Sequence, residues 1–359
     1  MIEWSIGILA LLAVVSPWIV RGLGRLGGIV LAAFPAAFGV WFAMQLPAVT
    51  SGEAITSLTP WIPEIGLNLS FHLDGLALIF TLLVLLIGAG VLLFAGTYMK
   101  DHPQRGRFFS YLIGFMVSML GLVLADNLLL LFIFWELTSI TSYLLIGFDH
   151  ERLSARKGAL QALLTTGLGG LIMLAGLVML GNAGGSFELS EIQSVADHAH
   201  YPAIVGLLLA GALTKSAQFP FHFWLPNAME APGPVSAYLH SSTMVKAGVY
   251  LIARTNPAMQ GADSHLWETL LICFGGTTMV VGAYLATRQT YYKRLLAYST
   301  VSSLGIMVML LGMGDKGAKA AMGYLLAHAM FKGCLFLVAA IVDHEAGEKR
   351  FTPVVYHLK

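Results

Sequence analysis

Residues 214–254 read TKSAQFPFHFWLPNAMEAPGPVSAYLHSSTMVKAGVYLIAR, an apolar stretch as long as two membrane spans that nevertheless holds two lysines. Two prolines, Pro220 and Pro226, follow Lys215. A proline has no backbone N–H, so Pro220 leaves the carbonyl of Ser216 without its helical partner. Such backbone must be buried in protein or line a wet cavity, and broken helices mark ion sites in transporters. The stretch predicts a span broken beside a buried lysine, with a simple proline kink as the alternative.

The composition of the whole chain indicates a membrane protein. Of 359 residues, 57% are hydrophobic and 11% are charged, against roughly 25% charged residues in a soluble domain. The net charge of +1 offers no basic face for nucleic acid. Cys273 and Cys334 lie far apart in apolar runs, which fits neither a disulfide framework nor a metal or iron–sulfur site. We therefore expect no metal site and no cofactor in this chain.

Apolar runs long enough to cross a hydrocarbon layer of about 30 Å as helices occupy most of the chain. We count about eleven, which predicts an all-α polytopic membrane protein and excludes a barrel of short strands. In the linker at 182–201, apolar residues at helical spacing after Ser190 predict a short helix on the membrane surface. The predicted spans cover residues 2–20, 26–47, 74–97, 108–125, 127–148, 159–181, 202–225, 235–254, 266–287, 294–312 and 319–343.

The loops between these spans differ sharply in positive charge. Lysine and arginine in short loops mark the cytoplasmic side of a membrane protein. One side collects most of the cations, whereas the other side has only Arg254, Lys316 and Lys319. The asymmetry predicts an amino terminus outside the cell and a carboxyl terminus in the cytoplasm.

Four charged residues belong to no loop and lie near the middle of predicted spans: Glu136, Lys215, Lys246 and Lys332. An ionised side chain at the bilayer centre costs at least about 2.5–3.5 kcal/mol, so its presence requires a reason. One reason is charge pairing that serves helix packing. The other, which four such residues favour, is a relay of titratable groups along a wet interior path.

Two histidines extend the candidate relay. His328 and Lys332 are four residues apart, so they share one face of a helix. His240 precedes Lys246 by six residues, which is not a same-face spacing in a regular helix. For His240, a polar role in helix packing is the alternative to proton transfer.

Four stretches of this sequence carry a family resemblance: FWELTS at 134–139, the 41 residues quoted above, LAYSTVSSLG at 296–305 and HAMFKG at 328–333. They resemble the antiporter-like subunits of complex I, and most closely the A subunit of Mrp-type multisubunit Na+/H+ antiporters. The lysine at 246 and VDHEAG at 342–347 favour the Mrp relative.

The resemblance implies a role for each buried charge. Glu136 matches the carboxylate of the fifth helix, and Lys215 matches its partner in a discontinuous seventh helix. Lys246 matches the next relay residue on the eighth helix, and His328 and Lys332 continue a central hydrophilic axis.

The resemblance also implies a domain organisation. Residues 1–107 are expected to form amino-terminal helices, 108–254 a first five-helix repeat that acts as a proton half-channel, 266–343 an incomplete second repeat, and 344–359 a cytoplasmic tail. Because the second broken helix of the family is not in the sequence, we expect a fragment or a split subunit that another chain completes.

The predicted function is that of a membrane subunit of a multisubunit cation/proton antiporter in a bacterial or archaeal inner membrane. It would move H+ and coupled Na+ through the Glu/Lys/His relay and would not be an enzyme. An alternative is a proton-translocating subunit of a complex I-like, membrane-hydrogenase-like or carbon-uptake complex. A third interpretation is a scaffold whose buried charges only hold helices together.

Overall fold

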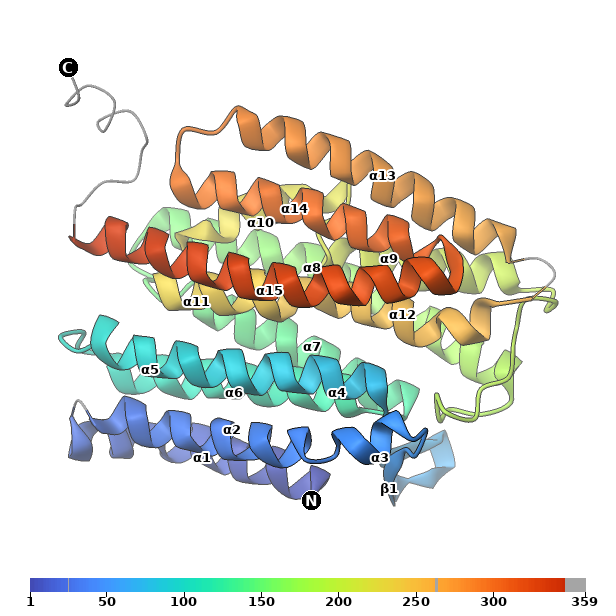
Figure 1. Ribbon diagram of the computed structural model, residues 1–359, viewed down its shortest axis with the longest axis horizontal. Helices are drawn as coiled ribbons and strands as arrows, with labels where there is room; N and C mark the ends of the chain where they lie inside the picture. Colours follow the sequence, from blue (N-terminus) through green and yellow to red (C-terminus); the bar gives the residue numbers. More distant parts are fainter. Residues whose placement is uncertain (25, 262–263, 346–359) are drawn as a thin grey trace.

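The computed structural model describes residues 1–24, 26–261 and 264–345, which form a bundle of long helices running along one axis (Figure 1). Within these residues, nine spans are helical along their length and apolar enough to cross a membrane. They are α1 (Ile2–Leu23), α2 (Leu26–Ala43), α4 with η2 and α5 (Gly75–Leu82, Leu83–Ile87, Gly88–Tyr98), α6 (Arg105–Leu124), α7 (Leu128–Ile146), α8 (Leu153–Gly184), α13 (His265–Thr287), α14 (Tyr292–Leu311) and α15 (Gly314–Glu345).

Two further spans are built from short segments, which completes the predicted count of eleven in the described part of the chain. The seventh comprises α9 (Tyr201–Lys215), η3 (Phe221–Phe223), α10 (Trp224–Asn227) and η4 (Ala228–Glu230). The eighth comprises α11 (Gly233–Ala237), η5 (Tyr238–Ser242), η6 (Met244–Lys246) and α12 (Ala247–Met259). The predicted break in the seventh span is confirmed, and the irregular middle of the eighth span was not predicted.

The helices lie in successive layers. Figure 1 shows α1 and α2 along one edge, the third span and α6 beside them, and α13 along the opposite edge. Helix α6 is the most deeply buried of the nine continuous spans. Large apolar side chains remain exposed on α1, α2, α8, α13 and α15, as expected of helices that face lipid.

Small residues allow close contact between two of the helices. Helices α13 and α14 pack along each other's length. A methyl group at Gly275 would collide with the backbone of Met309, and one at Gly305 would meet the backbone of Met279. In lipid, where helix association depends on close packing, such glycines let two backbones approach.

A β-hairpin that the sequence analysis did not predict fills part of the first long linker. Strands β1 (Ile55–Ile62) and β2 (Leu67–Leu73) pair antiparallel, with Ile55 opposite Leu73. The turn between them contains η1 (Pro63–Ile65) and Gly66, whose φ of 71° is the left-handed conformation that glycine adopts at little cost. A short helix, α3 (Leu46–Thr50), precedes the hairpin.

The predicted surface helix in the linker at 182–201 is wrong. Beyond Gly185 the chain forms turns, with an isolated bridge between Asn127 and Glu188. The Asp126 carboxylate accepts hydrogen bonds from both the backbone N–H and the hydroxyl of Ser190. These bonds to another part of the chain replace the local bonds that a helix cap at Ser190 would have made.

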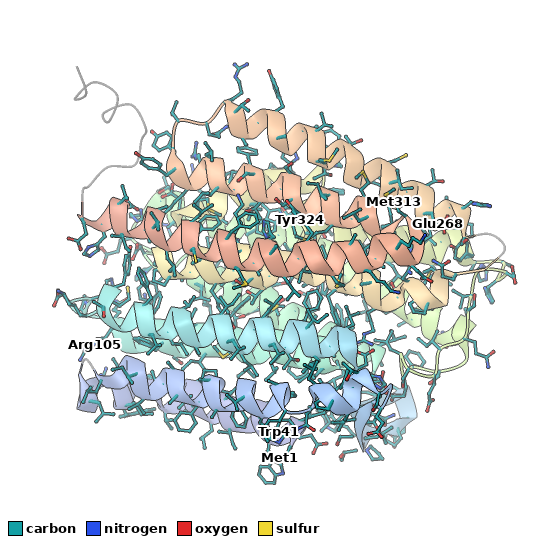
Figure 2. The ribbon with its side chains drawn as sticks, viewed as in Figure 1. Met1, Trp41, Arg105, Glu268, Met313 and Tyr324 are labelled. Carbon is teal, nitrogen blue, oxygen red and sulfur yellow. The ribbon has the colours of Figure 1, made fainter. Side chains whose placement is uncertain are left out.

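The cation-rich loops share one end of the bundle, as the charge pattern predicts. Figure 2 shows Arg105 at one end and Glu268 and Met313 at the other. Residues from the loops at 99–103 and 149–152 and from the start of α14 at 291–294 line one pocket at the first of these ends. Of the predicted tail at 344–359, residues 346–359 lie outside the described residues.

Candidate functional site

The seventh span breaks directly after Lys215, where α9 ends. The freed carbonyl of Ser216 accepts a hydrogen bond from Gln218 Nε2 at 2.9 Å, and the N–H of Phe219 donates to Thr278 Oγ1 at 3.0 Å. Protein groups therefore satisfy the broken backbone, as membrane depth requires. Pro220 lies in the break, whereas Pro226 lies inside the short helix α10 beyond it.

Lys215 is fully buried and its amine points to α7. Its Nζ donates to the carbonyl of Trp135 at 3.1 Å and to Ser139 Oγ at 2.7 Å. The amine also lies 5.1 Å from the centre of the Trp135 ring, within range of a cation–π interaction. The broken end of α9 thus places the Lys215 amine against neutral partners on α7.

Glu136 lies on α7 next to this amine and is half-buried. Its carboxylate rests on a glycine surface of α8, because a methyl group at Gly170 would collide with Oε1 and one at Gly167 would lie 3.7 Å from Oε2. Among the described residues, no ion pair within 4 Å joins Glu136 to Lys215, and Oε1 has no hydrogen-bond partner. The structure brings the predicted pair together as electrostatic neighbours rather than as a contact pair.

The eighth span carries Lys246 and His240 on its irregular segment. Lys246 ends η6, is fully buried, and donates from Nζ to the carbonyl of Leu325 in α15 at 3.2 Å. His240 lies in the π-helix η5, and neither of its ring nitrogens has a hydrogen-bond partner among the described residues. The two residues are separated by a change of helix type at Thr243, not by the regular helix that their spacing assumed.

Helix α15 supplies the last two predicted residues on one buried face. Lys332 donates from Nζ to Ser299 Oγ and, at 3.4 Å, to the carbonyl of Leu296, both in α14. His328 is fully buried, and neither ring nitrogen has a hydrogen-bond partner among the described residues. Lys246 and Lys332 both act on His328 electrostatically, so both amines lie near the histidine.

Hydroxyl acceptors for the amines were missed in the sequence analysis. Ser139 lies three residues after Glu136 in FWELTS, one helical turn along the same face. Ser299 lies within LAYSTVSSLG, among several serines that the sequence does not distinguish. The spacing in FWELTS was a usable signal, whereas the choice of Ser299 depends on how α14 packs against α15.

A second polar cluster, also missed, lies at the other end of the eighth span. Arg254 donates from Nη1 and Nη2 to the carboxylate of Asp74 at 2.6 and 2.9 Å, and from Nε to the hydroxyl of Tyr250 at 3.0 Å. Burial raises the pKa of the Asp74 carboxyl, but the Arg254 hydrogen bonds and charge outweigh it and hold the pKa below its ordinary value. Asp74 also caps α4 by accepting from the N–H of Ala77.

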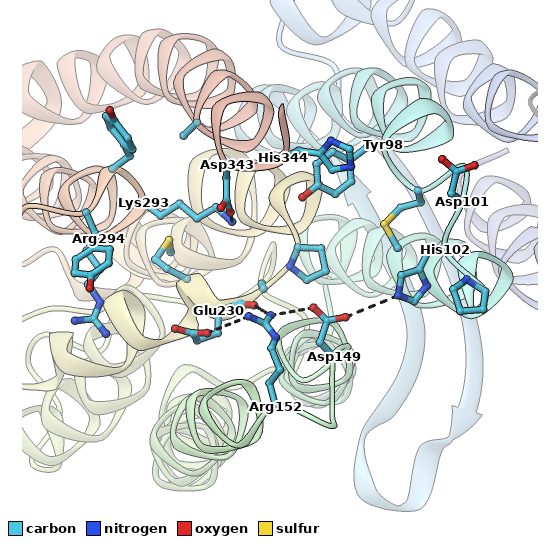
Figure 3. A pocket seen from close by; sticks show the side chains of 18 residues that line it. Tyr98, Asp101, His102, Asp149, Arg152, Glu230, Lys293, Arg294, Asp343 and His344 are labelled. Carbon is cyan, nitrogen blue, oxygen red and sulfur yellow. Dashed lines mark hydrogen bonds and ion pairs between the residues drawn. The ribbon is translucent and has the colours of Figure 1, made fainter. Parts of the chain in front are cut away.

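A polar cavity of about 600 Å³ opens at the cation-rich end (Figure 3). Arg152 links Asp149, at 2.9 Å, to Glu230, at 3.4 Å, and so ties the start of α8 to the end of the seventh span. Lys293 and Asp343 form a further ion pair at 3.0 Å. Lys293 precedes Leu296, a partner of Lys332, by one helical turn, so the cavity approaches Lys332 along α14.

The described side chains do not form a metal site. In residues 1–24, 26–261 and 264–345, no three His, Cys, Asp or Glu side chains are placed to hold a metal ion.

The fold and the charged residues buried inside its spans define a class of polytopic membrane protein with antiporter-like architecture. The family described as "NADH:quinone oxidoreductase/Mrp antiporter, TM" matches residues 125–354, and the amino-terminal family of complex I chain 5 matches residues 61–109. The chain belongs to the NADH:quinone oxidoreductase/Mrp antiporter transmembrane family.

Individual relatives agree with this membership. The A/B subunit of a probable K(+)/H(+) antiporter of Rhizobium meliloti is 48% identical over 90% of this chain and 32% of its own length. The A subunit of a Na(+)/H(+) antiporter of Alkalihalophilus pseudofirmus is 42% identical over 94% of this chain and 44% of its own length. The chain thus spans less than half the length of these curated relatives.

Solved structures show the same fold. A chain of the Mrp complex from Dietzia sp. DQ12-45-1b has a TM-score of 0.89 at 38% identity, with 96% of this chain and 38% of that chain covered. A chain of respiratory complex I from Thermus thermophilus has a TM-score of 0.82 at 22% identity, with 98% and 73% covered. The second likeness is one of fold alone.

Proposed function

We propose that this chain acts as a membrane subunit of a multisubunit cation/proton antiporter, with H+ and either Na+ or K+ as the transported ions. The names of the two bacterial relatives support the antiport activity and differ in the cation. The likeness to a chain of the Mrp complex supports a multisubunit assembly. The proposal includes another chain of the complex that supplies further helices. This chain spans less than half the length of these two relatives.

The observation that carries the proposal is the series of buried titratable groups across the bundle. The series runs from Glu136 and Lys215 through Lys246 and His328 to Lys332, each inside a span. Each amine donates to a neutral carbonyl or hydroxyl, and none has a carboxylate within 4 Å among the described residues. Intramembrane ionisable residues that face the bundle interior mark ion pathways and proton relays.

The arrangement suits stepwise proton transfer. An opposite charge favours the ionised form of a neighbour, and a like charge disfavours it. Protonation of Lys215 therefore influences Glu136 on one side, while His328 responds to Lys246 and Lys332 on the other. His240, beside Lys246 on the eighth span, is a candidate additional carrier. Under this proposal residues 108–254 contain the proton half-channel.

The proposal includes a location. The chain is a multi-span membrane protein, and its cation-rich end would face the cytoplasm of a bacterial or archaeal cell, with the amino terminus outside. The polar cavity at the cation-rich end would then open to the cytoplasm. This orientation gives protons from the cytoplasm a short approach to the relay.

The test is proton movement in vesicles that contain the complete complex, followed with a pH-sensitive dye after addition of Na+ or K+. Glu136→Gln should reduce cation-driven proton movement about tenfold or more with the complex intact, because a relay carboxylate is replaced by a group that cannot titrate. Glu268→Gln, in the first turn of α13 at the end of the bundle, is the matched control and should have no effect.

Each other result has a definite meaning. If neither cation drives proton movement in the native complex, the antiport proposal is overturned and redox-linked proton translocation becomes the better hypothesis. If Glu136→Gln impairs assembly but leaves the flux per assembled complex unchanged, Glu136 is a packing residue and the relay ends before it.

A further inference from the structure

Two π-helices in neighbouring spans meet at one hydrogen bond. The π-helix η2 interrupts the third span, and η5 forms part of the eighth. Tyr238, in η5, donates its hydroxyl to the carbonyl of Val84, in η2, at 2.8 Å. Tyr238 is 0% and Val84 is 1% exposed. Single π-turns in helices are rare and are frequently found at functional sites.

The surroundings of Tyr238 fix its ring and hydroxyl in place. Phe115 packs edge-on against the ring, with the ring centres 5.6 Å apart. Gly88 lies so close that an added methyl group would be 2.9 Å from the Tyr238 hydroxyl and 2.5 Å from Met116 Cε. The glycine therefore leaves just enough room for the hydroxyl to reach Val84.

From Tyr238, further hydrogen bonds lead to the backbone of Lys246. The carbonyl of Tyr238 accepts a hydrogen bond from Thr243 Oγ1 at 2.7 Å. The carbonyl of Thr243 accepts one from the N–H of Lys246 at 2.9 Å. Thr243 has φ −129° and ψ −87°, outside the helical region, so these bonds hold the point at which the helix type changes. In the sequence, His240 lies between Tyr238 and Lys246, the two residues that these hydrogen bonds connect.

From these contacts we infer that Tyr238 is a positioning residue, whose hydrogen bond to Val84 holds the irregular form of the eighth span and thereby places Lys246 and His240 in the relay. The inference rests on the proposed function for the role of the relay. Helix α15 packs against both π-helices, and Lys246 reaches α15 at Leu325. A change in η5 would therefore alter how Lys246 faces His328.

Tyr238→Phe removes only the hydroxyl. The buried carbonyl of Val84 would lose the hydrogen bond from this hydroxyl. The lost free energy should raise the population of locally unfolded states in this segment about tenfold. We expect faster amide hydrogen exchange in residues 239–246 of the purified complex, measured by mass spectrometry. We also expect slower cation-driven proton movement in vesicles, with a shifted pH profile, because Lys246 and His240 change their surroundings.

Tyr201→Phe is the matched control. The hydroxyl of Tyr201 is also buried and also donates to a backbone carbonyl, that of Met259, at 3.1 Å. Tyr201 begins α9, away from the irregular segment. This variant should leave both the pH profile and the exchange of residues 239–246 unchanged.

Two more variants test the hydrogen bond between Tyr238 and Val84 through other residues. Gly88→Ala should displace the Tyr238 hydroxyl, and Thr243→Val should remove the next bond in the chain. Each should reproduce the effect of Tyr238→Phe. Combined with Tyr238→Phe, Gly88→Ala should add less than its single effect, because both changes remove one interaction.

The readouts separate this inference from the proposed function. If native complex shows no cation-driven proton movement, the proposed function fails, while unchanged exchange in Tyr238→Phe would still overturn the role of Tyr238. If exchange rises but the pH profile stays native, the hydrogen bond is merely structural and the positioning role is overturned. A shifted profile with faster exchange, absent from Tyr201→Phe, supports the inference.

Discussion

Lys215 Nζ donates to the backbone carbonyl of Trp135, the residue that precedes Glu136. The amine therefore lies beside Glu136 but forms no ion pair with the Glu136 carboxylate within 4 Å. A contact pair deep in the bundle would hold both charges firmly, because breaking a buried pair leaves an uncompensated charge. Under the proposed function, neutral acceptors hold the amine in position while leaving its proton available for transfer. The relationship of Lys215 to Trp135 is therefore consistent with a switchable site.

Ser139 tests this interpretation, because its hydroxyl is the closer of the two acceptors. We expect Ser139→Ala to slow cation-driven proton movement about tenfold, since a net hydrogen bond to a charged group is worth about 1.5–3 kcal/mol. The complex should still assemble, with lower thermal stability, because Trp135 still accepts from Lys215. Ser142→Ala, which removes another buried hydroxyl one turn along α7, is the control. Equal fluxes in the two variants would contradict a specific role for Ser139.

The glycine surface under Glu136 provides a second prediction. Gly170→Ala should push the Glu136 carboxylate away from α8, since the colliding atom is the free end of a flexible side chain. We expect slower proton movement and a shifted pH profile with nearly native stability. Gly167→Ala, one turn earlier on α8, places its methyl group at ordinary contact distance from the carboxylate and should behave as native. The prediction is wrong if the two variants have the same pH profile in the vesicle assay.

The spans and the buried charges could be predicted because both depend on local sequence. Apolar length fixes how many times the chain can cross a membrane, and Pro220 marks the break in the seventh span. The π-helices could not be predicted in this way, because η5 is held by a bond from Tyr238 to Val84 in a distant part of the chain. The prediction of a helix after Ser190 was wrong for the same reason, because Ser190 donates its backbone N–H and its hydroxyl to the distant Asp126 carboxylate.

The sequence indicated which charged residues lie inside the spans more fully than how those residues are arranged. Charged residues inside spans are conspicuous in a chain with few charges. Their partners are carbonyls and hydroxyls, such as Leu325 and Ser299, which carry no such signal. The cluster of Asp74 and Arg254 was missed because each lies at a predicted span end, where charges are ordinary.

This cluster joins the start of α4 to the end of α12 by two charged hydrogen bonds. Arg254 also reaches Tyr250, whose hydroxyl donates to the carbonyl of Val123 at 2.8 Å and so includes α6. The Arg254 side chain is 13% exposed, so its partner on α4 cannot be replaced by bulk water without local opening. We therefore expect Asp74 to contribute to the stability of this end of the bundle.

Asp74→Asn should lower the free energy of unfolding by about 2 kcal/mol near neutral pH, because a neutral amide replaces a carboxylate paired with Arg254. The pKa of Asp74 is below its ordinary value in the folded protein. Its contribution is therefore complete above the ordinary value, about 3.9, and is lost as the pH falls through the folded pKa. Thermal unfolding of purified complex should show a constant difference between native protein and variant from about pH 8 to pH 5, shrinking below about pH 4. Asp315→Asn, in the exposed first turn of α15, is the control. A difference that grows on acidification would show that the carboxylate is not stabilised by Arg254.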